Sequence, residues 1–532
     1  MKNILFLFFF IFEVSFSQAP SVDWMKRFGG TNNEYFRSAI QTQDGGYLIG
    51  GYSGSDVSGI KTELRKGFNF DYWILKLDAN GVIEWQKDLG GGGTWAFTEL
   101  TGEIFTSLSQ ASDGSYYVCG YSDSPILGDK TEGCYGSDDY WIVKLSSSGA
   151  VLWDKTIGGA SADRCYAVES TPDGGCVVAG QSASGISGNK TEDSRGGWDY
   201  WVVKLSALGT IDWQRTIGGS GSDSSYSIVS NSDGSCVVGG VSNSNFSGEK
   251  SQNSKGGGDY WVLKLDVNGA IVWQNTIGSA SNDAFYRIVK GDNCYLICGG
   301  SDSGISFDKT ENSKGGVDFW IVKIDMQGTI VWDKTIGGSD TDSLYGAAAI
   351  STGGFILTGD TYSGISGDKT ESNYGGLDAW IVRIDANGLV LWDKDFGTGS
   401  DEGFNQVVSL ADGSFLFGGG SYSNVAGNIT VPGYGGLDYW LTKLQPENLS
   451  IDSFNISSVQ IYPNPTTSIV NIKTNNEAIQ SIQLIDVQGR ILQNQSINAF
   501  SGQVDLSNYQ KGTYFLKLTI NGETKVMKVL KN

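Results

Sequence analysis

The sequence predicts an all-β protein, a seven-bladed β-propeller of four-stranded blades followed by a small immunoglobulin-like β-sandwich. The main observation is a motif of Asp, then Tyr, Phe or Ala, then Trp, which recurs seven times at a spacing of about 60 residues. Seven copies at one period indicate a repeat architecture. The composition agrees, because 76 glycines, only 7 prolines and 12% aromatic residues favour many short strands joined by tight turns. The motif tryptophans are Trp73, Trp141, Trp201, Trp261, Trp320, Trp380 and Trp440.

One repeat contains four expected strands. In the repeat around Trp153 they are strand a (151–157), strand b (about 166–170), strand c (176–181) and strand d (199–205). The b–c link is the turn Asp173-Gly174-Gly175, and Asp-Gly supplies the positive φ angles of tight hairpin turns. The c–d link is long, about 17 residues. We expect it to cross from blade to blade, which would make strand d the innermost strand and strand c the outermost.

The two ends of the repeat array are complementary. The array begins with strands a, b and c (about 22–52) and ends with an isolated strand d (438–444). Pairing 438–444 with 22–28 would close the ring and remove its open edges. We therefore predict seven blades sealed by the last and first strands.

Residues 1–17 have the pattern of a secretory signal peptide. Lys2 supplies the positive end, residues 4–12 form a short apolar core, and Ser15 and Ser17 are small residues before an expected cleavage at Gln18. No other segment approaches eighteen apolar residues, so we expect no membrane span in the mature chain. The expected organisation is a signal peptide (1–17), the propeller (18–444), a linker (445–458) and a second domain (459–532).

The last domain carries the most specific motifs of the chain. They are Ile-Tyr-Pro-Asn-Pro at 461–465, Ile-Asp-Val-Gln-Gly-Arg at 485–490, Leu-Ser at 506–507, Gly-Thr-Tyr at 512–514, and a basic tail at 525–532. This region resembles the type A C-terminal sorting domain of the type IX secretion system. The resemblance assigns the motif to Pro463, Asn464, Pro465, Gly489, Gly512, Tyr514 and Lys528.

That resemblance implies handling by the type IX machinery, passage across the outer membrane, and a cell-surface or extracellular location after removal of the domain. An ordinary immunoglobulin-like binding module is the alternative. The 60-residue units resemble bacterial β-propeller repeats of secreted proteins, which supports the fold and implies no particular activity.

Two tryptophans fall outside the repeated columns. Trp95 lies with Phe97 in an eight-residue insertion, and Trp198 directly precedes Asp199. An aromatic side chain in an irregular loop is a candidate platform for a sugar ring or an apolar side chain. The alternative is that these rings pack against their own blades.

Several function classes are disfavoured. The chain has no histidine, which removes His-based catalytic triads, the usual zinc sites and haem ligation by His. The net charge of −21 disfavours nucleic acid as a partner. The seven cysteines, an odd number, are expected to be small buried hydrophobic residues. The Asp-x-Asn-Gly turns lack the twelfth ligand of a calcium loop, so no metal or cofactor is expected.

Charged residues also recur at fixed positions. Strand d carries a basic column that we expect to cover apolar surface and pair with acids of the c–d links, although a cationic channel is the alternative. It consists of Lys76, Lys144, Lys204, Lys264, Lys323, Arg383 and Lys443. The motif Gly-Gly-x-x-x-Asp-x-x-Tyr is expected to cap the a–b link through its Asp, as at Asp163, Asp223 and Asp342, with a metal site as the alternative.

The sequence favours an exported propeller that binds a protein or a glycan and performs no chemistry of its own. One alternative is a carboxylate-dependent glycan-degrading enzyme, because paired carboxylates alone can hydrolyse glycosides. Another is a structural or adhesive surface component. Nearly every acidic residue is repeated around the ring, whereas catalysis needs one unique set, so the enzyme is disfavoured.

Overall fold

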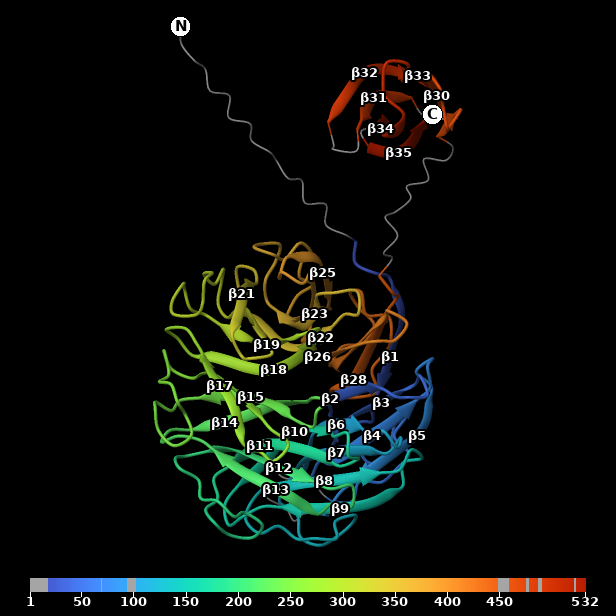
Figure 1. Cartoon of the computed structure of the whole chain (residues 1–532). Helices are drawn as coiled ribbons and strands as arrows, with labels where there is room; N and C mark the ends of the chain where they lie inside the picture. Colours follow the sequence, from blue (N-terminus) through green and yellow to red (C-terminus); the bar gives the residue numbers. More distant parts are fainter. Residues whose placement is uncertain are drawn as a thin grey trace. The chain divides into compact units, whose positions relative to one another are not determined.

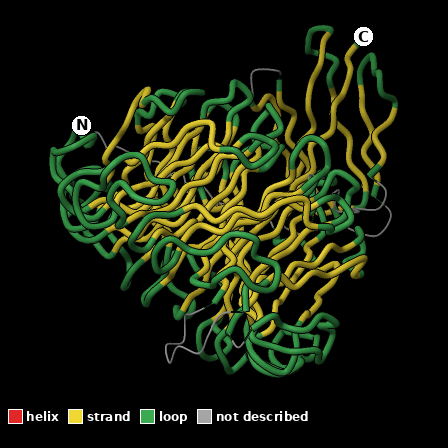
Figure 2. Tube along the Cα trace, turned by 90° about the horizontal axis from the view of Figure 1, so that it is seen from below, coloured by secondary structure: helices red, strands yellow, loops and turns green. Residues whose placement is uncertain are grey.

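A computed structural model describes residues 18–67, 69–92, 102–447, 459–474, 478–486, 490–520 and 523–532 (Figure 1). Every regular element in these ranges is a β-strand, from β1 to β35 (Figure 2). The chain splits into two compact units, residues 1–447 and 448–532. The predicted signal peptide lies outside the described residues.

The first unit contains seven four-stranded antiparallel sheets, each ordered b-c-d-a. The b strands are β2 (Glu34–Gln41), β6 (Glu103–Gln110), β10 (Asp163–Ser170), β14 (Asp223–Ser230), β18 (Asp283–Gly291), β22 (Asp342–Ala349) and β26 (Glu402–Ser409). The c strands are β3 (Tyr47–Ser53), β7 (Tyr116–Ser122), β11 (Cys176–Ser182), β15 (Cys236–Ser242), β19 (Cys294–Ser301), β23 (Phe355–Thr361) and β27 (Phe415–Ser421).

The remaining strands complete the blades. The d strands are β4 (Asp71–Leu77), β8 (Asp139–Leu145), β12 (Asp199–Leu205), β16 (Asp259–Leu265), β20 (Asp318–Asp325), β24 (Asp378–Ile384) and β28 (Asp438–Leu444). The a strands are β5 (Ile83–Leu89), β9 (Val151–Ile157), β13 (Ile211–Ile217), β17 (Ile271–Ile277), β21 (Ile330–Ile336), β25 (Val390–Phe396) and β1 (Val22–Phe28). We number the blades from β2–β5 as the first to β26, β27, β28 and β1 as the seventh.

The predicted order of strands within a blade is wrong. The b strands surround the centre of the ring and the a strands lie at its rim (Figure 1). Strands c and d are neighbours, with Cys176 opposite Leu205, so the long c–d link stays within one blade and the shorter a–b link crosses to the next. Strand d is apolar on both faces because a neighbouring blade covers each face of the sheet.

The predicted pairing of the two ends is confirmed. Strand β1 pairs with β28, from Val22 opposite Leu444 to Phe28 opposite Tyr439. The Tyr439 hydroxyl then donates a hydrogen bond of 3.0 Å to the Trp73 carbonyl, which joins the seventh blade to the first. The same bond joins other neighbouring blades, as from Tyr140 to the Trp201 carbonyl at 2.9 Å.

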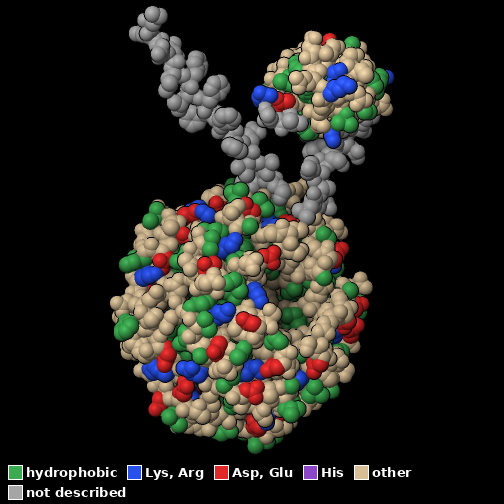
Figure 3. Space-filling view, in the orientation of Figure 1, with side chains coloured by type: hydrophobic (Ala, Val, Ile, Leu, Met, Phe, Trp, Pro, Cys, Tyr) green, Lys and Arg blue, Asp and Glu red, His purple; other side chains and the backbone are tan. Residues whose placement is uncertain are grey.

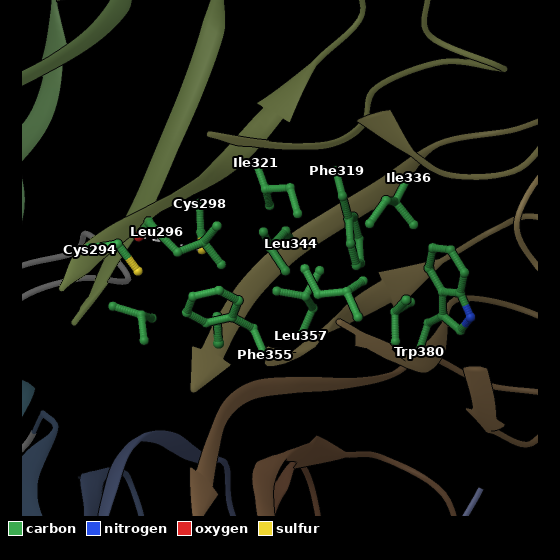
Figure 4. Close-up of a cluster of buried hydrophobic side chains, with 14 residues drawn as sticks. Cys294, Leu296, Cys298, Phe319, Ile321, Ile336, Leu344, Phe355, Leu357 and Trp380 are labelled. Carbon is green, nitrogen blue, oxygen red and sulfur yellow. Dashed lines mark hydrogen bonds between the residues drawn. The ribbon is translucent and has the colours of Figure 1, made fainter. Parts of the chain in front are cut away.

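The tryptophan columns hold neighbouring blades together. The seven d-strand tryptophans are fully buried. The a-strand tryptophans reach the d–a turn of the next blade, where Trp153 Nε1 donates to the Ala207 carbonyl at 3.1 Å and Trp213 Nε1 to the Val267 carbonyl at 2.9 Å. Figure 4 shows one layer between blades, in which Phe319, Leu344 and Trp380 belong to one apolar cluster. All seven cysteines are free and six are buried.

Each blade also buries titratable groups at its loop end. The first Asp of strand d accepts a backbone N–H from four residues earlier in six blades, as Asp199 Oδ2 does from Arg195 at 2.5 Å, and from five residues earlier in the first blade. In six blades a lysine of the c–d link enters this region, and Lys61 pairs with Asp88 at 2.5 Å. These lysines are Lys61, Lys130, Lys190, Lys250, Lys309 and Lys369, each at most 3% exposed.

The seventh blade obtains this cation from the closing strand. Its c–d link has the buried Ile429 at the position of the lysine. Arg27 of β1 lies 3.8 Å from Asp438 and donates to Ser421 Oγ, just as Lys130 donates to Ser122 Oγ in the second blade. Closure of the ring therefore supplies a charge as well as a strand.

The second unit is a sandwich of two sheets around its own core, as predicted. One sheet has the order β29-β30-β33 and the other β32-β31-β34-β35. The strands are β29 (Gln460–Tyr462), β30 (Ile469–Lys473), β31 (Ile479–Ile485), β32 (Ile491–Ala499), β33 (Ser501–Asp505), β34 (Gly512–Ile520) and β35 (Glu523–Lys531). Its apolar cluster includes Val470, Leu484 and Leu516.

Candidate functional site in the central channel

Every b strand contains one β-bulge, and all seven bulged residues line one cavity. A bulge leaves one residue without a partner on the next strand and re-aims its side chain. In β10, for example, Cys165 pairs with Gly180 and Ala167 with Ala179, which leaves Tyr166 unpaired. We call these residues the bulge ring: Arg37, Thr106, Tyr166, Tyr226, Tyr286, Tyr345 and Asn405. They surround a cavity of about 740 Å³, and the propeller is hollowed near its centre (Figure 3).

The bulge ring does not share the symmetry of the blades. Four consecutive blades, the third to the sixth, place a tyrosine in it. The Tyr166 and Tyr226 rings lie 5.1 Å apart, and those of Tyr286 and Tyr345 lie 5.0 Å apart at 72°. Tyr226 and Tyr286 are each 37% exposed. The result is an arc of aromatic surface on one side of the channel.

The other three blades contribute polar groups that the protein itself engages. Asn405 Nδ2 donates to the Phe36 carbonyl at 2.9 Å, and Thr106 Oγ1 donates to the Cys165 carbonyl at 3.1 Å. Arg37 Nη2 donates to the Tyr52 hydroxyl at 2.9 Å. This side of the channel is therefore polar and internally bonded.

Two carboxyl groups of the channel have raised pKa values. Burial raises the pKa of Glu169 to about 7, although the nearby Arg287 and Lys290 oppose the shift. Burial also raises the pKa of Asp360 to about 7, and the fields of Asp342 and Asp401 add to it. Both residues line the cavity. Each would therefore exchange protons near neutral pH, which is the property of a general acid or base.

The loop aromatic residues proposed from the sequence are only partly placed. Trp95 and Phe97 lie outside the described residues. Trp198 is half-buried directly before β12, and the Arg164 guanidinium lies over its ring, 5.7 Å from the ring centroid. Arg164 also lies over Tyr121 at 5.3 Å and pairs with Asp138 at 2.6 Å. Trp198 therefore stacks on a cation of the protein.

The basic column of strand d has partners other than those expected. Lys76 pairs with Asp44 at 2.9 Å and Lys204 with Asp173 at 2.8 Å, and both acids belong to b–c turns. The expected pairing with the c–d links is wrong, because the c–d link enters strand d at its first residue and the lysine lies near the last residue of that strand. Burial opposes ionisation of Asp44, but hydrogen bonds from Lys76 and Thr42 outweigh it and lower its pKa to about 2.

The expected loop caps are confirmed. Asp163 Oδ2 accepts from the Gly159 N–H at 2.7 Å, Asp223 from Gly219 at 2.7 Å and Asp342 from Gly338 at 2.6 Å. The tyrosine of the same motif is the bulge tyrosine in three blades. The sequence motif therefore included three residues of the bulge ring. That these tyrosines point into the channel could not be predicted, because strand d was expected at the centre of the ring.

A second feature that the sequence did not predict is a ring of exposed apolar side chains on the c–d links. Each lies four residues before the buried lysine position and is 53% to 73% exposed. They are Val57, Ile126, Ile186, Phe246, Ile305, Ile365 and Val425.

Among the described residues, no group of three or more His, Cys, Asp or Glu side chains is placed to hold a metal ion. Within the same residues, no helix has the length and apolar character needed to cross a membrane.

The sorting-motif residues of the second unit tie its first strand region to its last strand. Asn464 Nδ2 donates to the Lys528 carbonyl at 2.8 Å, and Asn464 Oδ1 accepts from the Leu530 N–H at 2.9 Å. Pro463 and Pro465 flank this residue, each after a cis peptide bond. Tyr514 is buried and donates to the Gln510 carbonyl at 2.8 Å. Gly489 lies outside the described residues.

Comparison with known proteins identifies the second unit. Residues 460–532 match the family described as the secretion system C-terminal sorting domain. The chain is 24% identical over 492 residues to the regulatory protein FlaEY of Caulobacter vibrioides, covering 85% of this chain and 50% of that protein. It is 33% identical over 79 residues to the ulvan lyase NLR42 of Nonlabens ulvanivorans, or 15% of each chain. It thus spans half of the first relative and a small part of the second.

Solved structures with similar folds have low sequence identity. The WD40 domain of Neurospora crassa Pan2 has a TM-score of 0.39 at 10% identity, covering 79% of this chain and 90% of that one. A protein of unknown function from Dyadobacter fermentans has a TM-score of 0.39 at 11% identity, covering 80% and 100%. The sheet order of the first unit is that of a propeller, and the match of residues 460–532 to the sorting domain indicates type IX secretion to the cell surface or the extracellular space.

Proposed function

We propose that the secreted propeller is a binding module that takes a protein segment or a glycan into its central channel. The observation that carries the proposal is the bulge ring. All seven bulges aim side chains into one cavity, yet only four neighbouring blades supply tyrosine. Residues that pack blades together repeat in nearly every blade, so a departure from the repeat at an unpaired, solvent-facing position favours a role outside packing.

The dimensions of the cavity indicate the type of ligand. A volume of about 740 Å³ lies within the range of small-ligand clefts, about 300 to 1,000 Å³. Such a cavity suits the end of an oligosaccharide or a few residues of a peptide, and it excludes a folded domain. Tyrosine rings provide rigid apolar faces with a polar tip, which suit both ligand types.

Glycan and peptide arrays probed with the purified propeller test this proposal, followed by two variants of the fourth blade. Tyr226→Ala should weaken binding of the selected ligand about tenfold, because one stacking surface is removed. Phe246→Ser is the matched control, since Phe246 is an exposed aromatic residue of the same blade outside the channel. Equal affinity of the Tyr226→Ala variant, at unchanged melting temperature, would contradict channel binding.

The loop aromatics offer a second contact surface in this proposal. Trp95, Phe97 and Trp198 would extend the binding site beyond the channel. Trp95→Ala is then expected to weaken binding while leaving the melting temperature nearly unchanged. Retained binding would limit the site to the channel.

A second candidate function is carboxylate-dependent glycan cleavage, favoured by the pKa values near 7 of Glu169 and Asp360. Incubation with glycans selected on the array, followed by chromatography of the products, tests it. Product release that is lost in both Glu169→Gln and Asp360→Asn would support an enzyme. Binding without products would leave the binding module.

A further inference from the structure

Asp360 is an acid at a position where no other blade has one. It lies in β23, and its counterparts in the other c strands are neutral: Tyr52, Tyr121, Gln181, Val241, Gly300 and Gly420. Its side chain is only 8% exposed and lines the channel cavity. Within the described residues, its carboxylate has no side-chain hydrogen bond or ion pair to another residue. A buried carboxylate without such a partner is costly when ionised, so it either keeps its proton, as the pKa of about 7 allows, or gains a compensating positive charge.

Two tyrosines of the bulge ring lie close enough to this carboxylate for its charge to act on their phenols. The Tyr286 and Tyr345 rings lie 5.0 Å apart and nearly perpendicular, at 72°. Burial raises the pKa of both phenols, and the nearby Asp360 carboxyl adds to the shift of each. Gly403 also lies beside this carboxylate, since a Cβ at this position would lie 3.4 Å from Asp360 Oδ2. We call Asp360, Tyr286 and Tyr345 the acidic notch.

The first and second blades show what an aromatic ring at this position of strand c accepts. There the counterparts of Asp360 are Tyr52 and Tyr121, and each has a cation of the protein over its ring. Arg37 lies 5.4 Å from the Tyr52 ring and Arg164 lies 5.3 Å from the Tyr121 ring. The acidic notch combines its two aromatic rings with a carboxylate. The charged groups that act on Asp360 are the acids Asp342 and Asp401, in contrast to the arginines over Tyr52 and Tyr121.

We propose that the acidic notch binds an organic cation, the ammonium or guanidinium group of the ligand that enters the channel. The rings would contact the cation through their faces and Asp360 would neutralise its charge. This inference rests on the proposed function, because it names the chemical group that the same channel recognises. A basic peptide side chain and an amino sugar both present such a group.

Binding should depend on pH in a defined direction. The titratable groups that face Asp360 are Asp342, Asp401, Tyr286 and Tyr345. The pKa of Asp360 is about 7, and a cation favours its ionised form. Affinity should therefore rise from pH 6 to pH 8, and binding near pH 6 should release a proton.

Ligand-observed NMR with small probes tests the proposal on the full chain. The probes are n-butylammonium and n-butylguanidinium, with n-butanol as the neutral analogue of the same length. We expect both cations to bind, n-butanol not to bind, and Asp360→Asn to weaken the cations about tenfold or more. Asp302→Asn is the matched control, because Asp302 is an exposed acid of the neighbouring blade and the change in net charge is the same.

The outcomes separate this inference from the function on which it rests. Cations that bind Asp360→Asn as well as the wild type would overturn the acidic notch. A glycan or peptide selected on the arrays that needs Tyr226 but is not displaced by the cations would support the binding module and contradict the acidic notch. Cation binding lost in Asp360→Asn, with no array ligand that needs Tyr226, would uphold the notch and refute the proposed function. Asp360→Gly guards against misfolding, because Gly300 and Gly420 already occupy this position in other blades.

Discussion

The blade framework and the channel are built from the same seven repeats, but they differ in how faithfully the repeats are copied. In the framework, every d strand begins with a buried Asp and carries a fully buried Trp. In the bulge ring, the corresponding side chains are one Arg, one Thr, one Asn and four Tyr. The repeat therefore acts as an internal control. Positions that all blades share maintain the fold, whereas positions that differ at a solvent-facing site are candidates for recognition.

Deletion of residues 436–444 should have the largest effect on the framework. It removes β28, so that β1 loses its partner and the seventh and first blades lose their contact through Tyr439. We expect the cooperative thermal transition, followed by near-UV circular dichroism, to broaden and move to much lower temperature. A truncated protein that melts like the full chain would show that the ring does not depend on this seal.

The cation of the seventh blade allows a sharper test of the framework. Arg27→Thr gives the a strand the Thr found in several sister blades but leaves Asp438 buried without its cation. Breaking one partner of a buried ion pair costs about 3 to 5 kcal/mol, so urea unfolding should show a loss of this order.

Ile429→Lys should rescue that loss, because it restores the lysine that the other six blades carry. In the wild-type background the same substitution places a second buried cation beside Arg27 and should destabilise. A double-mutant cycle by urea denaturation therefore predicts strong coupling. Additive effects would contradict the view that Arg27 replaces the missing lysine.

The buried aspartates predict how stability depends on pH. Burial raises the pKa of all seven d-strand aspartates, to about 6 for Asp199, Asp318 and Asp378. The folded state then binds more protons than the unfolded state from about pH 4 to 6, and up to higher pH at Asp139 and Asp71, whose pKa values are about 7 and 9. The free energy of unfolding therefore falls as pH rises through this window. A carboxyl whose pKa is one pH unit higher in the folded state than in the unfolded state changes this free energy by about 1.4 kcal/mol.

The urea midpoint should accordingly be higher at pH 5.5 than at pH 7.5. Above pH 8 the trend should reverse, because burial lowers the pKa of Lys190 and Lys250 to about 8 and their neutral forms then dominate only in the folded state. A midpoint that rises steadily from pH 5.5 to 7.5 would show that the aspartates are paired more strongly than their hydrogen bonds and ion pairs indicate.

The framework could be predicted from the sequence because its signals are repeated. The period of Trp73 and its sisters fixed the number of blades, and the isolated strands at 22–28 and 438–444 indicated their pairing. The prediction of the radial order of the strands was wrong, because the long c–d link was taken to mean that its two strands lie in different blades. The c–d link is long because it folds over its own blade to deliver Lys190 and its sisters to buried acids.

The channel could not be predicted for a related reason. A bulge is a local shift in register, and no residue pattern in the b strands predicts where it occurs. Tyr166 was visible in a repeated motif, but only the paired strands show that it points into the cavity. The sequence motifs did not single out Asp360, because it differs from the repeat: its six counterparts in the other c strands carry no charge.

The most direct test of the central claim makes the bulge ring uniform. A variant in which Tyr166, Tyr226, Tyr286 and Tyr345 are all replaced by Thr copies the residue that the second blade already has at this position, Thr106. Calorimetric titration of the array ligand should show affinity reduced by about 100-fold or more, while the variant still unfolds cooperatively. A folded variant that binds the ligand as tightly as the wild type would contradict the claim that recognition resides where the repeats diverge.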